Sequence, residues 1–212
     1  MKISRDIEEY ILRHMDPQDP LLAELERETC LMAVNPRMLS GHLQGSILSV
    51  LSKMIQPSSI LEIGTYTGYS AICLAQGLAP GGRLITIEIN DELRDFAAKY
   101  FRKAGLQAVI DQRTGDARDI IPRLHESFDL IYMDGDKREY AEYFRLVFDT
   151  LKKGGWLLAD NTLWDGKVLG EESLLDRQTA GIVEFNRIIA EDNRIDKVIL
   201  PLRDGLTVIR KK

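Results

Sequence analysis

Residues 60–70 read Ile-Leu-Glu-Ile-Gly-Thr-Tyr-Thr-Gly-Tyr-Ser and join a short apolar run to an amphipathic stretch. An apolar run of this length that ends in a glycine-containing turn indicates a buried strand followed by a helix. Gly64 and Gly68 allow a sharp turn and a close approach of backbone amides to a ligand. The turn is not the G-x-G-x-x-G pattern, because Tyr66 stands at the middle position, and this counts against NAD as the ligand.

The alternation of short apolar runs and amphipathic stretches continues along the chain. We expect strands at residues 60–63, 84–88, 108–114, 129–133, 156–159, 198–202 and 206–209. We expect helices from residue 68, at 91–104, before 125, at 138–151 and at 181–190. This order predicts a mostly parallel sheet covered by helices on both faces, with an antiparallel pair around Arg203-Asp204-Gly205 at the C-terminal end.

The N-terminal part has a different pattern. Apolar residues recur at helical spacing before residue 58, and Asp19-Pro20 reads as the start of a helix, as does the region near Ser40. We therefore expect helices over residues 1–57 and an α/β core over residues 58–212. The length of 212 residues and the lack of a linker favour a single domain over 1–212.

Composition limits the function classes. The chain has 28 Lys and Arg against 33 Asp and Glu, a net charge of −5, so no global basic field attracts nucleic acid, although a local patch is not excluded. The sequence has neither a membrane-spanning run nor an apolar signal core, which predicts a cytoplasmic protein. Cys30 and Cys73 match no metal or redox spacing, which predicts two buried reduced thiols. Residues 210–212, Arg-Lys-Lys, read as a solvated tail.

Acidic residues lie in or just after four of the predicted parallel strands. They are Glu62, Glu88, Asp134 and Asp160. The carboxyl ends of parallel strands share one edge of a sheet, where open α/β sheets bind their ligands. The alternative is that each acid only ends its strand and caps the next helix. We expect the four together to mark a site.

Glu88 and the glycine turn suggest a nucleoside ligand. Glu88 follows the second predicted strand, 20 residues after Gly68 (88 − 68). A carboxylate at this place can bind both hydroxyls of a ribose. The glycine turn does not suit a pyrophosphate. Together with Glu88 it therefore predicts a nucleoside ligand without a diphosphate.

A second group of oxygen donors follows the fourth and fifth strands. Asp134, Asp160 and Asn161 supply two carboxylates and one amide carbonyl, with no His or Cys beside them in the sequence. Such a set suits Mg²⁺ best and also Mn²⁺ or Ca²⁺, rather than Zn²⁺. The alternative is that Asp136 caps the helix from residue 138 and Asn161 starts a turn.

Three stretches resemble a known family. Residues 61–70, the segment Met133-Asp134-Gly135-Asp136-Lys137 and residues 160–166, Asp-Asn-Thr-Leu-Trp-Asp-Gly, are similar to the cation-dependent O-methyltransferases that use S-adenosylmethionine. This group includes the caffeoyl-CoA and catechol O-methyltransferases. The similarity runs from about Pro36 to the C-terminus, and the bacterial caffeoyl-CoA-type members are nearest in length. The resemblance implies a Rossmann-like, doubly wound, mostly parallel seven-stranded sheet with an antiparallel C-terminal strand.

The resemblance also implies roles for single residues. The implied contacts of the cofactor are Glu62, Gly64, Thr65 and Ser70 at its methionine end, Glu88 at its ribose, Ala117 at its adenine, and Ser40 and Asp134 elsewhere. The implied metal ligands are Asp134, Asp160 and Asn161. The implied catalytic residues are Asp134 and Lys137, with Lys137 as the general base. The implied substrate contacts are Asp136, Trp164 and Asp165, the last replacing an Asn that is usual in the plant enzymes.

The leading interpretation is methylation of a hydroxyl on a small aromatic vicinal diol, with S-adenosylmethionine and a divalent cation as cofactors. One alternative within the family is methylation of a hydroxylated uridine in tRNA. An alternative of another class is a nucleotide-binding protein or an NAD enzyme, which predicts no metal dependence. A homodimer is expected from the resemblance alone.

Overall fold

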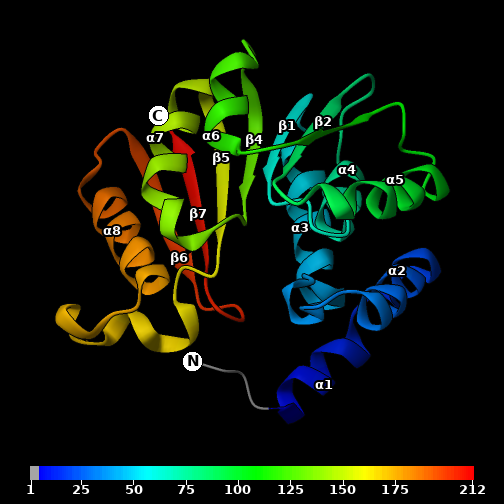
Figure 1. The fold of residues 1–212 in the computed structure, drawn as a ribbon, viewed down its shortest axis with the longest axis horizontal. Helices are drawn as coiled ribbons and strands as arrows, with labels where there is room; N and C mark the ends of the chain where they lie inside the picture. The colour runs from blue at the N-terminus through cyan, green and yellow to red at the C-terminus, as the bar shows by residue number, and fades with distance from the viewer. Residues whose placement is uncertain (1–4) are drawn as a thin grey trace. The chain divides into compact units, whose positions relative to one another are not determined.

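The computed structural model describes residues 5–212, and residues 1–4 of the predicted helical extension lie outside the described part. The described chain forms two compact units, residues 5–116 and residues 117–212. The sheet has seven strands in the order β3-β2-β1-β4-β5-β7-β6 (Figure 1). Its last strand is antiparallel to both of its neighbours. The predicted fold, a mostly parallel sheet with an antiparallel C-terminal pair, is confirmed.

Residues 5–116 contain three parallel strands. They are β1 (Ser59–Ile63), β2 (Arg83–Glu88) and β3 (Ile110–Thr114). In the register of β1 and β2, Glu62 is paired with Thr86. The interior positions of β1 and β2 are buried and mostly apolar, as expected for strands covered on both faces. Within β1 and β2 themselves, the buried polar side chains are those of Glu62 and Thr86.

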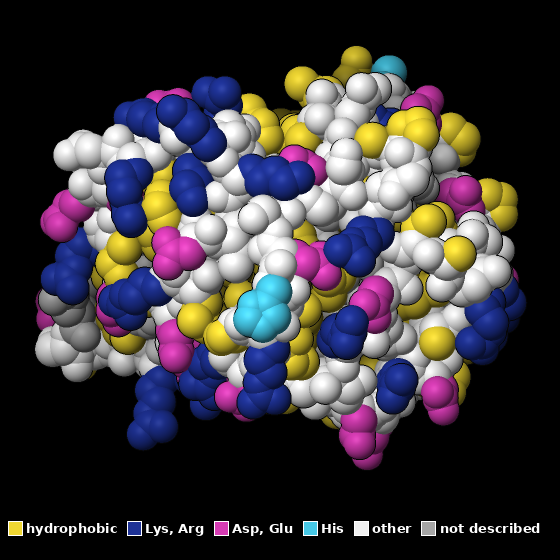
Figure 2. Space-filling view, turned by 90° about the horizontal axis from the view of Figure 1, so that it is seen from above, with side chains coloured by type: hydrophobic (Ala, Val, Ile, Leu, Met, Phe, Trp, Pro, Cys, Tyr) yellow, Lys and Arg dark blue, Asp and Glu magenta, His cyan; other side chains and the backbone are white. Residues whose placement is uncertain are grey.

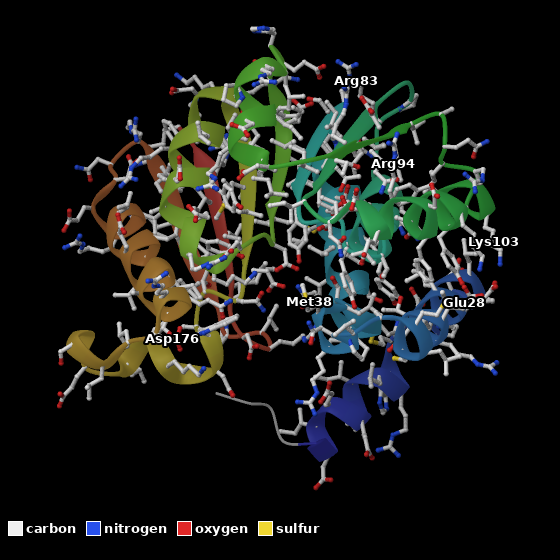
Figure 3. The ribbon with its side chains drawn as sticks, viewed as in Figure 1. Glu28, Met38, Arg83, Arg94, Lys103 and Asp176 are labelled. Carbon is white, nitrogen blue, oxygen red and sulfur yellow. The ribbon has the colours of Figure 1, made fainter. Side chains whose placement is uncertain are left out.

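The helices of residues 5–116 agree with the sequence prediction. They are α1 (Arg5–His14), α2 (Pro20–Met32), α3 (Gly41–Ile55), α4 (Tyr69–Ala75) and α5 (Arg94–Lys103), with the 3₁₀ turns η1 (Pro36–Met38) and η2 (Asp91–Leu93). Asp19 caps α2 as predicted, since its carboxylate accepts a hydrogen bond from the amide of Leu21 at 2.7 Å. An ion pair of 2.5 Å between Glu28 and Lys99 joins α2 to α5, and Figure 3 labels Glu28 on α2.

Residues 117–212 contain four strands and the helices that pack on them. The strands are β4 (Phe128–Met133), β5 (Leu151–Asp160), β6 (Ile195–Leu200) and β7 (Leu206–Lys211). The helices are α6 (Ala117–Ile120), α7 (Tyr140–Thr150) and α8 (Arg177–Glu191), with the 3₁₀ turns η3 (Ile121–Arg123), η4 (Lys137–Glu139), η5 (Trp164–Leu169) and η6 (Glu172–Leu174). Helix α7 packs on β4 and β5, and α8 packs on α7 and β6. Asp176, labelled in Figure 3, caps α8 through the amide of Thr179.

Aromatic side chains fix the first turn of α7 against α8. The rings of Tyr140 and Phe144 meet the ring of Phe185 edge to face, with centroids 5.7 Å and 5.8 Å apart. Gly181 lets α8 come close, because a Cβ atom there would lie 2.4 Å from the carbonyl oxygen of Lys137. The helix pair therefore holds the backbone around Lys137 in one place.

Two expectations from the sequence are wrong. Cys73 is buried as predicted, but Cys30 is exposed on α2. Residues 210–212 are not simply a solvated tail, since β7 continues to Lys211. The ammonium of Lys211 donates to the carbonyl oxygens of Phe148 and Leu151, at 2.7 Å each, where α7 ends. The free carbonyls of a helix C-terminus attract a cation, and the sequence pattern did not reveal this partner.

The predicted helix at 138–151 is divided into η4 and α7, and β5 begins at Leu151, earlier than the predicted residue 156. Within residues 5–212, no helix is both long enough and apolar enough to cross a membrane.

Candidate active site

The turn between β1 and α4 has the conformation that its glycines suggest. Gly64 and Gly68 have φ values of 99° and 92°, and Tyr66 between them has a φ of 48°. At Gly68 a Cβ atom would also lie 2.7 Å from the ring of Phe101. The amide of Gly64 donates to the carbonyl oxygen of Ile87 at 2.9 Å. The amide of Thr65 donates to the same carbonyl oxygen at 3.3 Å, so the turn is tied to the end of β2.

Glu88 is adjacent to this turn, as its spacing predicts. Its Oε2 accepts a hydrogen bond from the amide of Tyr66 at 2.7 Å, and its Oε1 accepts one from the amide of Asn90 at 2.9 Å. The carboxylate is half-buried and fixed by two backbone donors. It is thus a rigid acceptor beside the turn, which is the property a ribose site requires.

Glu62 is fully buried and is bound by a residue that the sequence analysis missed. The hydroxyl of Thr86 donates to Oε2 of Glu62 at 2.5 Å, and the hydroxyl of Thr65 lies 2.5 Å from that of Thr86. All three side chains have at most 1% of their surface exposed. A polar residue within the apolar run Leu-Ile-Thr-Ile at 84–87 was the available signal, and it pointed to a buried partner.

The other predicted cofactor residues lie at helix starts. Ser40 directly precedes α3, and Ser70 is buried in the first turn of α4. Ala117 is buried at the start of α6. Their predicted contacts with the cofactor stay predictions.

Residues 117–212 bring the predicted metal ligands together at the ends of two paired strands. Met133 and Ala159 are register partners in β4 and β5, and Asp134 and Asp160 are the next residues. Oδ1 of Asp160 accepts a hydrogen bond from the amide of Asn161 at 2.8 Å, and its Oδ2 accepts one from the hydroxyl of Tyr132 at 3.2 Å. The two carboxylates and Asn161 therefore share one strand edge, as predicted.

The electrostatics of Asp134 reflect this closeness. Burial raises the pKa of the Asp134 carboxyl to about 6. The positive charge of Lys137 opposes this rise, and the negative charge of Asp160 adds to it. Two carboxylates this close together are suited to bind a cation.

Lys137 is a buried lysine with two polar partners. Its Nζ lies 2.6 Å from Oδ1 of Asp134 and 2.8 Å from the hydroxyl of Tyr140. That hydroxyl is 3.1 Å from the carbonyl oxygen of Met133 and 2.9 Å from that of Asp160. Burial and the nearby carboxylates raise the pKa of Tyr140, so that it stays a neutral phenol. Tyr140, which the sequence analysis did not select, connects the lysine to both strand ends.

We expect Tyr140→Phe to lower the free energy of unfolding by about 1–3 kcal/mol, because the buried Lys137 ammonium and two strand-end carbonyls lose one partner. Urea unfolding of the purified variant measures this change. Tyr10→Phe is the control, since the Tyr10 side chain is exposed on α1, and we expect its effect to stay within about 0.5 kcal/mol. Equal stability of Tyr140→Phe and the unaltered protein would show that the contacts of this hydroxyl contribute nothing.

The loop after β5 is held by the turn between β6 and β7. Asn161 has a φ of 58°, a conformation that Asn tolerates better than most residues. The amide of Thr162 donates to the carbonyl oxygen of Gly205 at 3.0 Å, and the amide of Leu163 donates to that of Asp204 at 2.7 Å. These two bonds set the path of the chain directly after Asn161.

The predicted substrate residues lie at two different segments, η4 and η5. Asp136 is the N-cap of η4, with its carboxylate accepting from the amide of Arg138 and paired with that guanidinium, which lowers the pKa of Asp136. The capping alternative is thus confirmed for Asp136. Trp164 and Asp165 both have positive φ in the loop that begins η5, and the half-buried Trp164 keeps its indole nitrogen inside the protein. Their contacts with a substrate stay predictions.

Comparison with known proteins decides the family. The sequence model described as O-methyltransferase matches residues 13–212. The chain belongs to the O-methyltransferase family. Caffeoyl-CoA O-methyltransferase 1 of Arabidopsis thaliana is 31% identical over 98% of this chain and 85% of that protein. The catechol O-methyltransferase of Niastella koreensis is 39% identical over 75% of this chain and 73% of that protein.

Solved structures agree with this assignment. The O-methyltransferase from Bacillus cereus in complex with S-adenosylhomocysteine (SAH) has a TM-score of 0.91 at 29% identity, covering 98% of this chain and 97% of that one. The O-methyltransferase TomG from Streptomyces achromogenes in complex with S-adenosylmethionine has the same TM-score of 0.91 at 27% identity, covering 98% and 96%. This O-methyltransferase therefore belongs to the enzymes that transfer a methyl group from S-adenosylmethionine to oxygen, of the caffeoyl-CoA and catechol type. The alternative of an NAD enzyme is not supported.

Proposed function

We propose that the protein methylates a hydroxyl of a small aromatic vicinal diol with the assistance of a divalent cation. The observation that carries this proposal is the group Asp134, Asp160 and Asn161 at the ends of β4 and β5, beside the buried Lys137. An acceptor oxygen must lose its proton and align with the methyl group of the donor. Residues that hold a cation and a base next to each other suit this chemistry.

The donor set fits a hard cation. Two carboxylates and an amide carbonyl supply oxygen ligands only. Burial first, and then the negative charge of Asp160, raise the pKa of Asp134, and a bound cation would oppose both effects. Of the described residues, no three His, Cys, Asp or Glu side chains form a metal cluster, and the proposed set contains only two such residues, both Asp. A divalent cation held there supplies Lewis acidity and a template for two adjacent phenolic oxygens.

The side chains around this group have distinct proposed roles. Lys137 directs its Nζ to Asp134. We propose that this nitrogen accepts the phenolic proton when it is a neutral amine, or stabilises the phenolate when it is an ammonium. Tyr140 keeps Lys137 in place and remains protonated. Asp136, Trp164 and Asp165 are proposed to contact the acceptor.

Residues 5–116 supply the proposed cofactor contacts. The turn at 64–68 leads into α4 and is held in one conformation, and Glu88 offers a fixed carboxylate for the ribose. Ser40, Glu62, Thr65 and Ser70 complete the proposed set of this unit. Ala117 and Asp134 are proposed cofactor contacts within residues 117–212. Because donor and acceptor take part in one reaction, we propose that residues 1–212 act as a single methyltransferase domain. A cytoplasmic location and a homodimer also remain proposals.

A labelling assay tests the proposal. Purified protein is incubated with methyl-labelled S-adenosylmethionine, with Mg²⁺ or with EDTA. The acceptors are a panel of catechols and tRNA whose hydroxylated uridine lacks the methyl group. We expect labelled catechols, a loss of at least about 100-fold in rate with EDTA, and recovery with added Mg²⁺ or Mn²⁺.

The outcomes separate the candidates. Labelling that does not depend on the cation would contradict the metal role, and labelling of tRNA alone would replace the small acceptor by a nucleic acid. An RNA would need Lys and Arg side chains that can bind its phosphates. Two of the basic side chains already form ion pairs within the protein, since Lys167 lies 3.7 Å from Asp176 and Arg118 lies 3.1 Å from Glu139. On the face drawn in Figure 2, Lys and Arg side chains gather toward the left, with a few Asp and Glu side chains between them. The small-molecule acceptor is therefore favoured by the pairing of Lys167 and Arg118 and not by this view.

A further inference from the structure

Three buried side chains form a hydrogen-bonded chain under the turn between β1 and α4. Glu62 in β1 and Thr86 in β2 are register partners, and Thr65 is the second residue after β1. The oxygen atoms of Thr65 and Thr86 are 2.5 Å apart, and Oγ1 of Thr86 is 2.5 Å from Oε2 of Glu62. The three residues link the turn to the interior of the sheet.

The directions of these two hydrogen bonds follow from the number of hydrogen atoms. Thr86 has one hydroxyl hydrogen, which it donates to Glu62. The hydroxyl of Thr65 must then donate its own hydrogen to the oxygen of Thr86. Thr86 is therefore donor and acceptor at once, and only a hydroxyl side chain of this length can do both.

Burial makes this arrangement rigid. Thr86 and Glu62 are completely buried and Thr65 is 1% exposed, so water does not replace a lost partner. The backbone of the turn has a further link to β2, because the amide of Gly64 donates to the carbonyl oxygen of Ile87. Without the Thr86 hydroxyl, the side chain of Thr65 would lose its anchor, and the buried carboxyl group of Glu62 would have one donor fewer.

We propose that Thr86 is a positioning residue of the S-adenosylmethionine site, which fixes the turn at residues 64–68 through Thr65 and Glu62 before the cofactor binds. This inference rests on the proposed cofactor contacts of that turn. A turn held in its binding conformation does not have to be ordered by the ligand, so the anchor increases affinity without a contact of its own.

The binding of SAH, measured by calorimetry, tests the proposal. We expect Thr86→Val to weaken binding at least about tenfold, which corresponds to about 1.4 kcal/mol. Thr86→Ser keeps a hydroxyl and should bind within about threefold of the unaltered protein. The matched control is Thr207→Val, which removes an equally buried hydroxyl bonded to Thr162 at 2.7 Å in the other unit, and which should not change the affinity.

A double variant tests whether Thr86 acts through Thr65. If it does, Thr65→Val with Thr86→Val should bind SAH no more weakly than Thr65→Val alone, because the two effects are not independent. Hydrogen exchange of the amides at 64–68 should be faster in Thr86→Val and unchanged in Thr207→Val. If Thr86→Val does not fold, Thr86→Ala replaces it in the same comparison.

The outcomes distinguish this inference from the proposed function. Failure of the unaltered protein to bind SAH would overturn the proposed cofactor site itself. Normal binding by Thr86→Val, additive effects in the double variant, or an equal loss in Thr207→Val would overturn the role of Thr86 and leave the proposed function intact.

Discussion

Asp160→Asn should lower kcat/KM for a catechol by at least about 10³-fold, a loss of about 4 kcal/mol in transition-state stabilisation. The substitution replaces an anionic oxygen by a neutral amide of the same shape at the end of β5. The remaining set, Asp134 and Asn161, carries a single negative charge. A divalent cation binds more weakly to such a set, and the acceptor then loses both its template and its Lewis acid.

Two measurements separate the metal from the fold. Binding of Mn²⁺ should be much weaker in Asp160→Asn, whereas binding of SAH should remain within about threefold, because the proposed contacts of the methionine end and the ribose lie in residues 5–116. Asp129→Asn is the matched control, since Asp129 pairs with Lys152 at 2.8 Å at the opposite end of β4 and should keep full activity. Measurable turnover by Asp160→Ala in the presence of a chelator would refute the metal site.

Gly205→Ala should lower the free energy of unfolding by about 2–5 kcal/mol. This range is the sum of the cost of a strained backbone and the cost of a steric overlap. Gly205 has a φ of 90°, and a Cβ atom there would lie 2.5 Å from Cγ and 2.7 Å from the amide nitrogen of Leu163. The loop after β5 must move to relieve this overlap. Because that loop begins at Asn161, we also expect at least about a tenfold loss of methyl transfer.

Gly166→Ala separates the two contributions. Gly166 has a similar φ of 81°, but no atom lies within 4 Å of its added Cβ. The free energy of unfolding of Gly166→Ala should fall only by the cost of the strained backbone, about 1–2 kcal/mol. Urea unfolding of both glycine variants measures the two changes. Equal losses in the two variants would show that contact between the β6–β7 turn and Leu163 does not restrain the loop.

Local patterns predicted most of the fold because they depend on neighbouring residues. The alternation of apolar runs and amphipathic stretches gave the order of strands and helices, since buried strands and amphipathic helices have different periods. Asp19 before Pro20 predicted the start of α2 correctly, because a cap acts within one turn of its helix. Strand limits were less accurate, as for β5, since pairing with β4 extends it to Leu151.

The candidate site was predictable where residues follow strands in sequence. Parallel strands align their carboxyl ends, so the register that pairs Met133 with Ala159 also brings Asp134 beside Asp160. Glu88 lies beside the turn at Tyr66 because β1 and β2 are also parallel and end at the same edge. Residues that act from the middle of an element were not predictable in this way. Thr86 and Tyr140 look like ordinary strand and helix residues until their partners are known.

The sequence by itself determined the order of the elements, the glycine turn and the acids that follow the strands, because each depends on a few adjacent residues. Only the tertiary structure decided which buried polar groups meet. It paired Thr86 with Glu62 and Lys137 with Tyr140, and it bound Lys211 to the end of α7 although the sequence suggested a solvated tail. The physical reason is that a buried polar atom must find its partner in space, and that partner lies on whichever element packs against it.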